Sequence, residues 1–257
     1  MKIVEFTAEG AKVKGYLHED HEALVAHKVR PALIVCPGGG YTHLSAREAD
    51  PPALEFFAMG YQVFILSYSL STPGLQPQRE LAAAVSMVRK RSAEWHIGPE
   101  KIAVMGFSAG GHLVASLGAL WNNPRADLPE TSRPNALILC YPVITMGELT
   151  HEGSRDVITG GSEELKELLS VENQVTADFP PTFLWHTVDD GCVPVENTML
   201  LARQLQKNHI PFECHLFAHG HHGLANCNVE VESPSPECRR WLELSKTWLN
   251  NRFAFVP

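Results

Sequence analysis

The stretch Gly-Phe-Ser-Ala-Gly at residues 106–110 decides the interpretation of this sequence, because it joins an apolar run to a helical one. Residues 102–105 (Ile-Ala-Val-Met) have the continuous apolar character of a buried strand, and residues 111–117 predict a helix. A serine in such a strand–turn–helix takes a strained conformation, and only small residues two positions to either side avoid a clash. This context predicts that Ser108 is a nucleophile rather than an inert serine in a tight turn.

The helix that begins after Ser108 offers one donor for a negatively charged oxygen. The Ala109 backbone N–H faces the anion that forms when the hydroxyl attacks a carbonyl. A second donor usually comes from the loop after an upstream strand. Here that loop is Pro-Gly-Gly-Gly-Tyr at 37–41, and its glycines can turn N–H groups toward a ligand without side-chain obstruction. We expect Gly39 and Gly40 to donate, with a merely flexible turn as the alternative.

A nucleophilic serine needs a histidine that takes its proton and a carboxylate that orients the histidine. With this kind of serine turn, the acid and then the histidine follow the serine along the chain. The acid is expected in the loop 187–194, where Asp189 and Asp190 are both candidates. The base is expected after the last predicted strand, where the chain has three candidates, namely His219, His221 and His222.

The same His-x-His-His cluster is the strongest candidate for a metal site. Metal ligation would require a companion carboxylate or paired cysteines at ligand spacing, and the cluster has neither. We therefore expect no metal and no cofactor.

Short apolar runs alternate with longer amphipathic runs along the chain, which is typical of a parallel sheet joined by crossover helices. The pattern predicts an α/β fold: a mostly parallel central sheet of about eight strands flanked by helices, in one domain over residues 1–257. The first two strands look like an antiparallel edge. Residues 142–181 contain one predicted helix and are too short for a second domain, so we expect a small lid there. The predicted strands are 2–7, 13–17, 32–36, 62–68, 102–105, 136–141, 182–186 and 212–217, and the predicted helices are 52–59, 78–92, 109–121, 163–170, 194–208 and 236–250.

Composition excludes several classes of function. The 257 residues are 44% hydrophobic and 19% charged with a net charge of -8, so the chain has material for a core and no basic excess for nucleic acid. No uncharged apolar run approaches the roughly 20 residues of a membrane span, and the N-terminus shows no export signal. Six single cysteines are consistent with reduced thiols. We expect a soluble, cytoplasmic protein with a small-molecule partner and leave the oligomeric state open.

Four segments together resemble the acetyl esterase and acetylxylan-esterase-like branch of the α/β-hydrolase superfamily, over nearly the whole chain. In that family the acid lies four residues before the proline of a Val-Pro pair, which implies Asp190 rather than Asp189. The base immediately precedes the glycine of a closing His-Gly-Leu, which implies His222. The four segments are residues 37–41, 106–113, 185–197 and 219–224.

Two further features bear on the resemblance. Pro37 stands where the related hormone-sensitive-lipase-like esterases have the histidine of His-Gly-Gly-Gly, which favours the acetyl-esterase branch. The family's Ser-x-Arg-Glu stretch occurs at 45–48, and its plain interpretation is a capping box in which Ser45 and Glu48 satisfy helix-start N–H groups. We assign no catalytic role to Arg47 or Glu48. Four other histidines have no evident chemical task, namely His112, His186, His209 and His215.

The resemblance implies a serine carboxylic-ester hydrolase that works through an acyl-enzyme and removes short acyl groups, such as acetyl, from small or sugar esters. A peptidase or amidase of the same fold is the first alternative, because the triad chemistry is shared. A non-catalytic scaffold is the second, although its usual mark is a lost triad residue and every element is present here.

Overall fold

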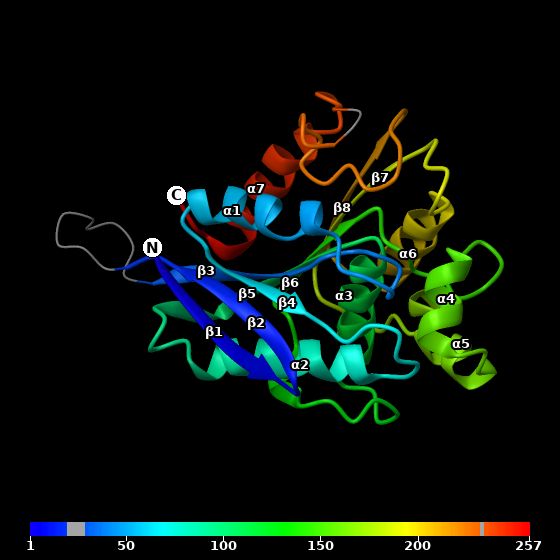
Figure 1. Ribbon diagram of the computed structural model, residues 1–257, viewed down its shortest axis with the longest axis horizontal. Helices are drawn as coiled ribbons and strands as arrows, with labels where there is room; N and C mark the ends of the chain where they lie inside the picture. Colours follow the sequence, from blue (N-terminus) through cyan, green and yellow to red (C-terminus); the bar gives the residue numbers. More distant parts are fainter. Residues whose placement is uncertain (20–28, 232–233) are drawn as a thin grey trace.

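The computed structural model describes residues 1–19, 29–231 and 234–257, and within them one eight-stranded sheet forms the centre of the molecule (Figure 1). The strand order is β1-β2-β4-β3-β5-β6-β7-β8. The strands are β1 Lys2–Ala8, β2 Ala11–Leu17, β3 Arg30–Cys36, β4 Gln62–Ser67, β5 Ile97–Phe107, β6 Ala136–Cys140, β7 Thr182–Thr187 and β8 Phe212–Phe217.

The direction of the strands follows the apolar pattern of the sequence. β1 pairs antiparallel with β2, and β2 pairs antiparallel with β4, whereas all neighbours from β4 to β8 are parallel. The continuously apolar strand β6 is buried along its whole length, and β3 is buried except at its first residue, because helices cover both faces of the sheet. The predicted α/β fold with an antiparallel edge is confirmed.

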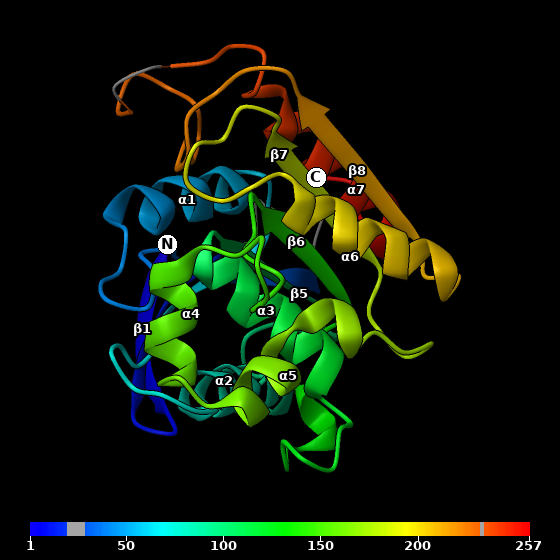
Figure 2. The same ribbon diagram turned by 90° about the vertical axis from the view of Figure 1, so that its right-hand side faces the viewer.

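Two groups of helices cover the two faces of the sheet (Figures 1 and 2). The helices α2, α3 and α6 contribute to one buried apolar cluster, and α1 and α7 contribute to the other. Pro51 lies in the first turn of α1, as the sequence predicts, but Pro194 precedes its helix, which begins only at Glu196. The α-helices are α1 Asp50–Ala58, α2 Gln76–Lys90, α3 Ala109–Leu120, α4 Glu152–Thr159, α5 Glu163–Leu169, α6 Glu196–Lys207 and α7 Arg240–Phe253.

The segment 142–181 is more structured than its sequence predicts. It contains two α-helices, α4 and α5, and a short 3-10 helix at Val171–Asn173, where only one helix was expected. Ile158 and Leu169 of this segment are fully buried and belong to the same apolar cluster as α3. Figure 2 shows α4 and α5 lying in front of α3, so the segment covers the core on that side.

No helix among residues 1–19, 29–231 and 234–257 is both long enough and apolar enough to cross a bilayer. All six cysteines are free thiols, as expected from their scattered positions.

Candidate active site

The turn between β5 and α3 holds Ser108 in a conformation that ordinary residues avoid. Its φ and ψ angles are 54° and −119°. A Cβ on Gly106 would meet the backbone of Gly110, and a Cβ on Gly110 would meet the carbonyl oxygens of Cys36 and Pro37 at the end of β3. Both flanking glycines are therefore required, as the sequence predicts, and the strained turn lifts the serine to the carboxyl edge of the sheet.

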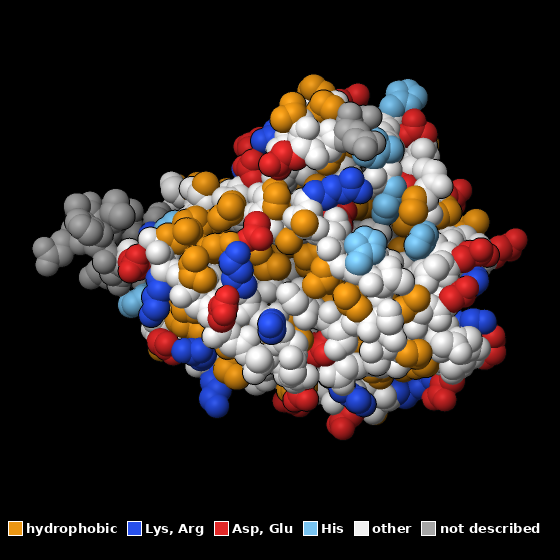
Figure 3. Space-filling view, viewed as in Figure 1, with side chains coloured by type: hydrophobic (Ala, Val, Ile, Leu, Met, Phe, Trp, Pro, Cys, Tyr) orange, Lys and Arg blue, Asp and Glu red, His pale blue; other side chains and the backbone are white. Residues whose placement is uncertain are grey.

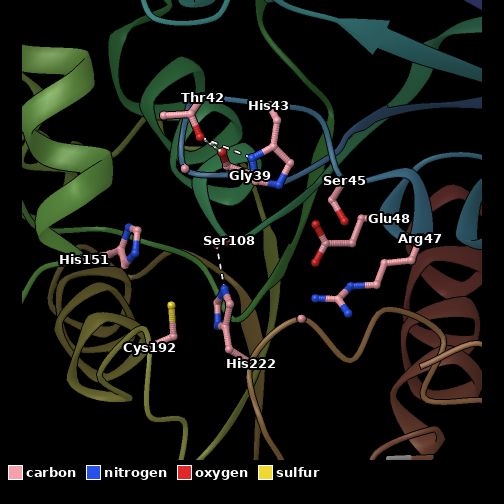
Figure 4. A pocket seen from close by; sticks show the side chains of 12 residues that line it. Gly39, Thr42, His43, Ser45, Arg47, Glu48, Ser108, His151, Cys192 and His222 are labelled. Atoms are coloured by element: carbon pink, nitrogen blue, oxygen red, sulfur yellow. Dashed lines mark hydrogen bonds between the residues drawn. The ribbon is translucent and has the colours of Figure 1, made fainter. Parts of the chain in front are cut away.

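Ser108 begins a chain of hydrogen bonds that joins three loops at this edge. Its Oγ lies 2.8 Å from Nε2 of His222, and Nδ1 of His222 lies 2.7 Å from Oδ2 of Asp190. Because a carboxylate only accepts, Nδ1 carries a proton and Nε2 is left to accept the serine proton. The structure thus brings Ser108 together with the two residues that the resemblance implied, Asp190 and His222, and Figure 4 shows the Ser108–His222 hydrogen bond.

The surroundings of Asp190 keep it ionised. Burial of the Asp190 carboxyl raises its pKa, but hydrogen bonds from His186 and His222 outweigh burial and hold the pKa well below its usual range. The other carboxylate oxygen accepts the backbone N–H groups of Cys192 and Val193, at 2.8 and 3.0 Å. An ionised carboxylate in this place can stabilise a positive charge on the His222 ring.

His186 is a partner of this acid that sequence analysis missed. Its Nε2 lies 3.2 Å from the Asp190 carboxylate and 3.0 Å from the Val193 carbonyl oxygen, and its Nδ1 lies 2.8 Å from the Thr198 hydroxyl. Both contacts of Nε2 are acceptors, so Nε2 carries the proton. His186 therefore donates a hydrogen bond that holds the Asp190 carboxylate in place. The only signal in the sequence was its position four residues before Asp190.

The competing candidates lie outside this chain of bonds. Asp189 is half exposed, accepts the Gly220 N–H at 2.7 Å and pairs with His219, whose side chain is 85% exposed. His221 is exposed, with its Nδ1 2.7 Å from the carbonyl oxygen of His222. Asp189 and His219 thus tie the acid loop to the histidine loop at the surface.

The glycine loop after β3 presents backbone N–H groups beside Ser108. Gly39 and Gly40 have φ angles of 124° and 62°, and a Cβ on Gly39 would meet the backbone of His43. In the described part of the chain, neither N–H has an acceptor. The Gly38 N–H is different, since it donates to Glu48 at 2.9 Å. Ala109 is the first residue of α3, where an N–H has no partner within the helix.

Glu48 corrects the interpretation of Ser-x-Arg-Glu as a capping box. Ser45 makes no side-chain capping bond, and the Glu48 carboxylate instead accepts the Gly38 N–H and the Tyr141 hydroxyl, the latter at 2.8 Å. The Tyr141 oxygen in turn accepts the Ala225 N–H at 2.9 Å, three residues beyond His222. Glu48 is 3% exposed, so one buried carboxylate links the glycine loop, the end of β6 and the histidine loop.

His112 also links elements around the serine. Its Nδ1 lies 2.8 Å from the Tyr41 hydroxyl and its Nε2 lies 2.8 Å from the Leu169 carbonyl oxygen. Burial lowers the pKa of His112 to about 4, against a weaker opposing effect of the Leu169 bond. The neutral ring therefore fastens α3 to the glycine loop and to the segment 142–181.

Ser108 lines a surface pocket of about 250 Å³. Figure 3 shows histidine side chains gathered around a hollow on this face of the molecule, and Figure 4 shows that His151 and Arg47 lie on opposite sides of the Ser108–His222 pair. No group of three or more potential metal ligands occurs among the described residues. The pocket is lined by Gly39, Gly40, Thr42, His43, Ser45, Arg47, Glu48, Ser108, His151, Cys192, His222 and Gly223.

A strained serine between a strand and a helix, followed along the chain by an aspartate and a histidine on a mostly parallel sheet, defines the α/β-hydrolase class. Within that class, the chain belongs to the family described as BD-FAE, whose model matches residues 22–205.

Solved structures of esterases are similar to this chain over almost its full length. An acetyl ester-xyloside bifunctional hydrolase from Caldicellulosiruptor lactoaceticus is 36% identical with a TM-score of 0.85, covering 96% of this chain and 90% of that one. The carboxylesterase Cest-2923 from Lactobacillus plantarum is 27% identical with a TM-score of 0.90, and both chains are covered completely. These similarities place the chain in the esterase branch of the superfamily.

Curated relatives are longer proteins. Endo-1,4-beta-xylanase B of Butyrivibrio fibrisolvens is 38% identical over 229 residues, which are 85% of this chain and 35% of that protein. The acetylxylan esterase of Xylanibacter ruminicola is 31% identical over 202 residues, which are 75% of this chain and 40% of that protein. The chain spans between about a third and a half of the length of the curated relatives it matches.

Proposed function

We propose that this protein is a serine carboxylic-ester hydrolase that uses Ser108, His222 and Asp190 as a catalytic triad. The observation that carries the proposal is the unbroken chain of hydrogen bonds, 2.8 and 2.7 Å long, from the Ser108 hydroxyl through His222 to a buried carboxylate. Membership of the BD-FAE family and likeness to solved esterases support the same activity.

The reaction begins when the Ser108 oxygen attacks the ester carbonyl and its proton passes to Nε2 of His222. The C–O bond of the ester breaks, and the same proton leaves with the alcohol. Water then attacks the acyl-enzyme, gives a proton to His222, and releases the acid while Ser108 regains its hydrogen. Asp190 stabilises the imidazolium in both steps.

The negative charge on the carbonyl oxygen is stabilised by backbone donors. Gly39 and Gly40 present N–H groups without acceptors in the described chain, and Ala109 adds the first N–H of α3. Such donors act most strongly on charge that develops during the reaction, because they are already oriented before the substrate reacts.

The pocket and the relatives support a proposal for the substrate. A volume of about 250 Å³ lies below the usual range for drug-sized ligands, about 300–1,000 Å³, which favours a short acyl group such as acetyl. The names of two similar proteins contain acetyl ester and acetylxylan. We infer an acetyl ester of a small alcohol or a sugar as the substrate.

Labelling with a fluorophosphonate tests the nucleophile. The folded protein should form a covalent adduct at Ser108, identified by peptide mass spectrometry, and Ser108→Ala should give none. No adduct on folded wild-type protein would leave only the non-catalytic scaffold.

Rates on three substrates test the class of reaction. We expect kcat/KM to be highest for 4-nitrophenyl acetate, lower for the octanoate, and lowest for an aminoacyl anilide. Preference for the anilide would instead support the peptidase or amidase alternative.

A further inference from the structure

His151 is a pocket residue that the triad chemistry does not use. It is the N-cap residue of α4, and its Nδ1 accepts the Ser154 backbone N–H at 3.1 Å. The Ser154 hydroxyl lies 2.8 Å from the same nitrogen. A histidine in this capping position does locally what Asn or Asp side chains do more often.

The cap fixes which nitrogen of His151 carries the proton. Since Nδ1 accepts the Ser154 N–H, the neutral ring is protonated at Nε2. Partial burial lowers the pKa of His151, the nearby His222 lowers it further, and Asp190 opposes both effects. The ring is therefore neutral at pH 7, and its Nε2–H is a donor without a partner in the described residues.

The His151 ring lies beside the glycine loop. His151 lines the same pocket as Ser108, and its Cε1 lies 3.7 Å from the position that a Cβ on Gly40 would take. Figure 4 shows the His151 ring on the side of the pocket away from Arg47. In the proposed reaction, backbone N–H groups already bind the carbonyl oxygen of the ester. The Nε2–H of His151 is therefore available to another oxygen of the substrate.

We propose that His151 is a specificity-determining residue, whose Nε2–H donates a hydrogen bond to a hydroxyl oxygen on the alcohol part of the substrate. The inference rests on the proposed function and deepens it, since it selects esters of polyhydroxylated alcohols over esters of simple phenols. Because α4 belongs to the segment 142–181, that segment contributes a contact to the substrate as well as part of the pocket wall.

A pair of variants separates substrate binding from helix capping. His151→Asn keeps a strong N-cap oxygen but is too short to place a donor where Nε2 lies, whereas His151→Ala removes both. The measured quantity is kcat/KM for a monoacetylated methyl xyloside divided by kcat/KM for 4-nitrophenyl acetate. One neutral hydrogen bond corresponds to roughly a fivefold to tenfold effect, so we expect this ratio to fall by about that factor in both variants.

Ser162→Ala is the matched control. Ser162 caps α5 through the Leu165 N–H at 3.3 Å and does not line the pocket, so the ratio should stay as in the wild type. A merely structural role of His151 would lower both rates together and leave the ratio unchanged, which would overturn the inference. So would a wild type that hydrolyses nitrophenyl acetate but not the xyloside. Activity on neither ester, together with no fluorophosphonate adduct, would instead refute the proposed function.

Discussion

Asp189 and Asp190 are neighbours in sequence, but Asp189 is half exposed and Asp190 is buried. This difference leads to the first prediction. Asp190→Asn should lower kcat on 4-nitrophenyl acetate by on the order of 10³–10⁴-fold, because an amide cannot stabilise the imidazolium or hold His222 in the required tautomer. Asp189→Asn removes only an exposed pairing with His219, so its kcat should change by less than about tenfold. Steady-state kinetics of both variants at pH 7.5 provide the measurement, and a larger loss for Asp189→Asn would exchange the two roles.

The buried carboxylate of Glu48 leads to a second prediction. Glu48→Gln replaces an oxygen that accepts a hydrogen bond by an NH₂ group that faces a donor, either Gly38 N–H or the Tyr141 hydroxyl. A buried unsatisfied donor costs about 1–3 kcal/mol, which we expect as lost stability in urea denaturation. Displacement of the glycine loop should also lower kcat more than it raises KM.

The control for Glu48 is Ser45→Ala. Because the Ser45 side chain makes no capping bond, the free energy of unfolding should change by less than about 0.5 kcal/mol. A loss of about 1 kcal/mol or more in Ser45→Ala, with little effect in Glu48→Gln, would restore the capping box.

Some residues of the site could be predicted from the sequence and others could not. The motif around Ser108 is local, so five residues and their flanks were enough to select it. Glu48 could not be recognised, because its partner Tyr141 lies 93 positions away and meets it only in the folded chain. His186 has a local partner, Asp190, four residues later, but that spacing alone does not show that the two side chains meet. Local patterns favour local partners, and the capping box was the nearest local explanation.

The turn between β5 and α3 makes a prediction about a whole element. Gly106→Ala should destabilise the protein by about 1–3 kcal/mol or more and abolish fluorophosphonate labelling, because the added methyl group meets the backbone of Gly110 and the turn must open. Gly191→Ala is a matched control in the acid loop, where an added Cβ has nothing within 4 Å. Full labelling of Gly106→Ala at wild-type stability would show that the turn does not need its glycine.

His112 joins three elements and predicts how stability depends on pH. Its pKa is about 4 in the folded protein and about 6.5 in the unfolded chain, so between these values the unfolded chain binds more protons. The stability from the neutral ring is fully present above pH 6.5 and is lost as the pH falls toward 4. The loss from this group between pH 7 and pH 5 is about 2 kcal/mol.

The measurement compares wild type with His112→Gln, whose amide can still donate to Leu169. Other histidines with lowered pKa, such as His18 and His151, contribute equally to both proteins. The free energy of unfolding in urea should therefore fall by about 2 kcal/mol less in the variant than in the wild type between pH 7 and pH 5. Equal losses in the two proteins would mean that His112 is not held neutral by its surroundings.

At the level of elements, strands were easier to predict than helices. All eight predicted strands exist: β3 and β6 have continuous apolar runs, whereas the edge strands β1 and β8 include charged residues. Their ends differ from the prediction by two residues or fewer, except that β5 begins five residues earlier. The helix Glu152–Thr159 was missed for a physical reason: it is one of the shorter helices, carries Gly153 in its first turn, and is capped by His151 instead of a usual capping residue.

The whole molecule is expected to behave as one cooperative unit, although residues 142–181 have the length of a lid. The two apolar clusters lie on opposite faces of the same sheet, so neither can persist when the sheet separates. Trp95 belongs to one cluster, and Trp185 and Trp241, stacked 5.4 Å apart, belong to the other. Tryptophan fluorescence therefore reports on both faces, and its urea transition should coincide with that of far-ultraviolet circular dichroism.

Hydrogen exchange tests whether the segment 142–181 belongs to the same cooperative unit. The Val171 N–H donates to the Ile144 carbonyl oxygen at 3.0 Å, and Leu169 beside it is fully buried and bonded to His112. If the segment is part of the core, its amide protons exchange only through global unfolding and show the same protection as those of β5 and β6. A lid that opens independently would instead lose protection at Val171 while the strands keep theirs. Equal protection, together with the coincident urea transitions, would establish that the substrate pocket has one fixed wall at His151 and that access to Ser108 does not depend on a separate opening step.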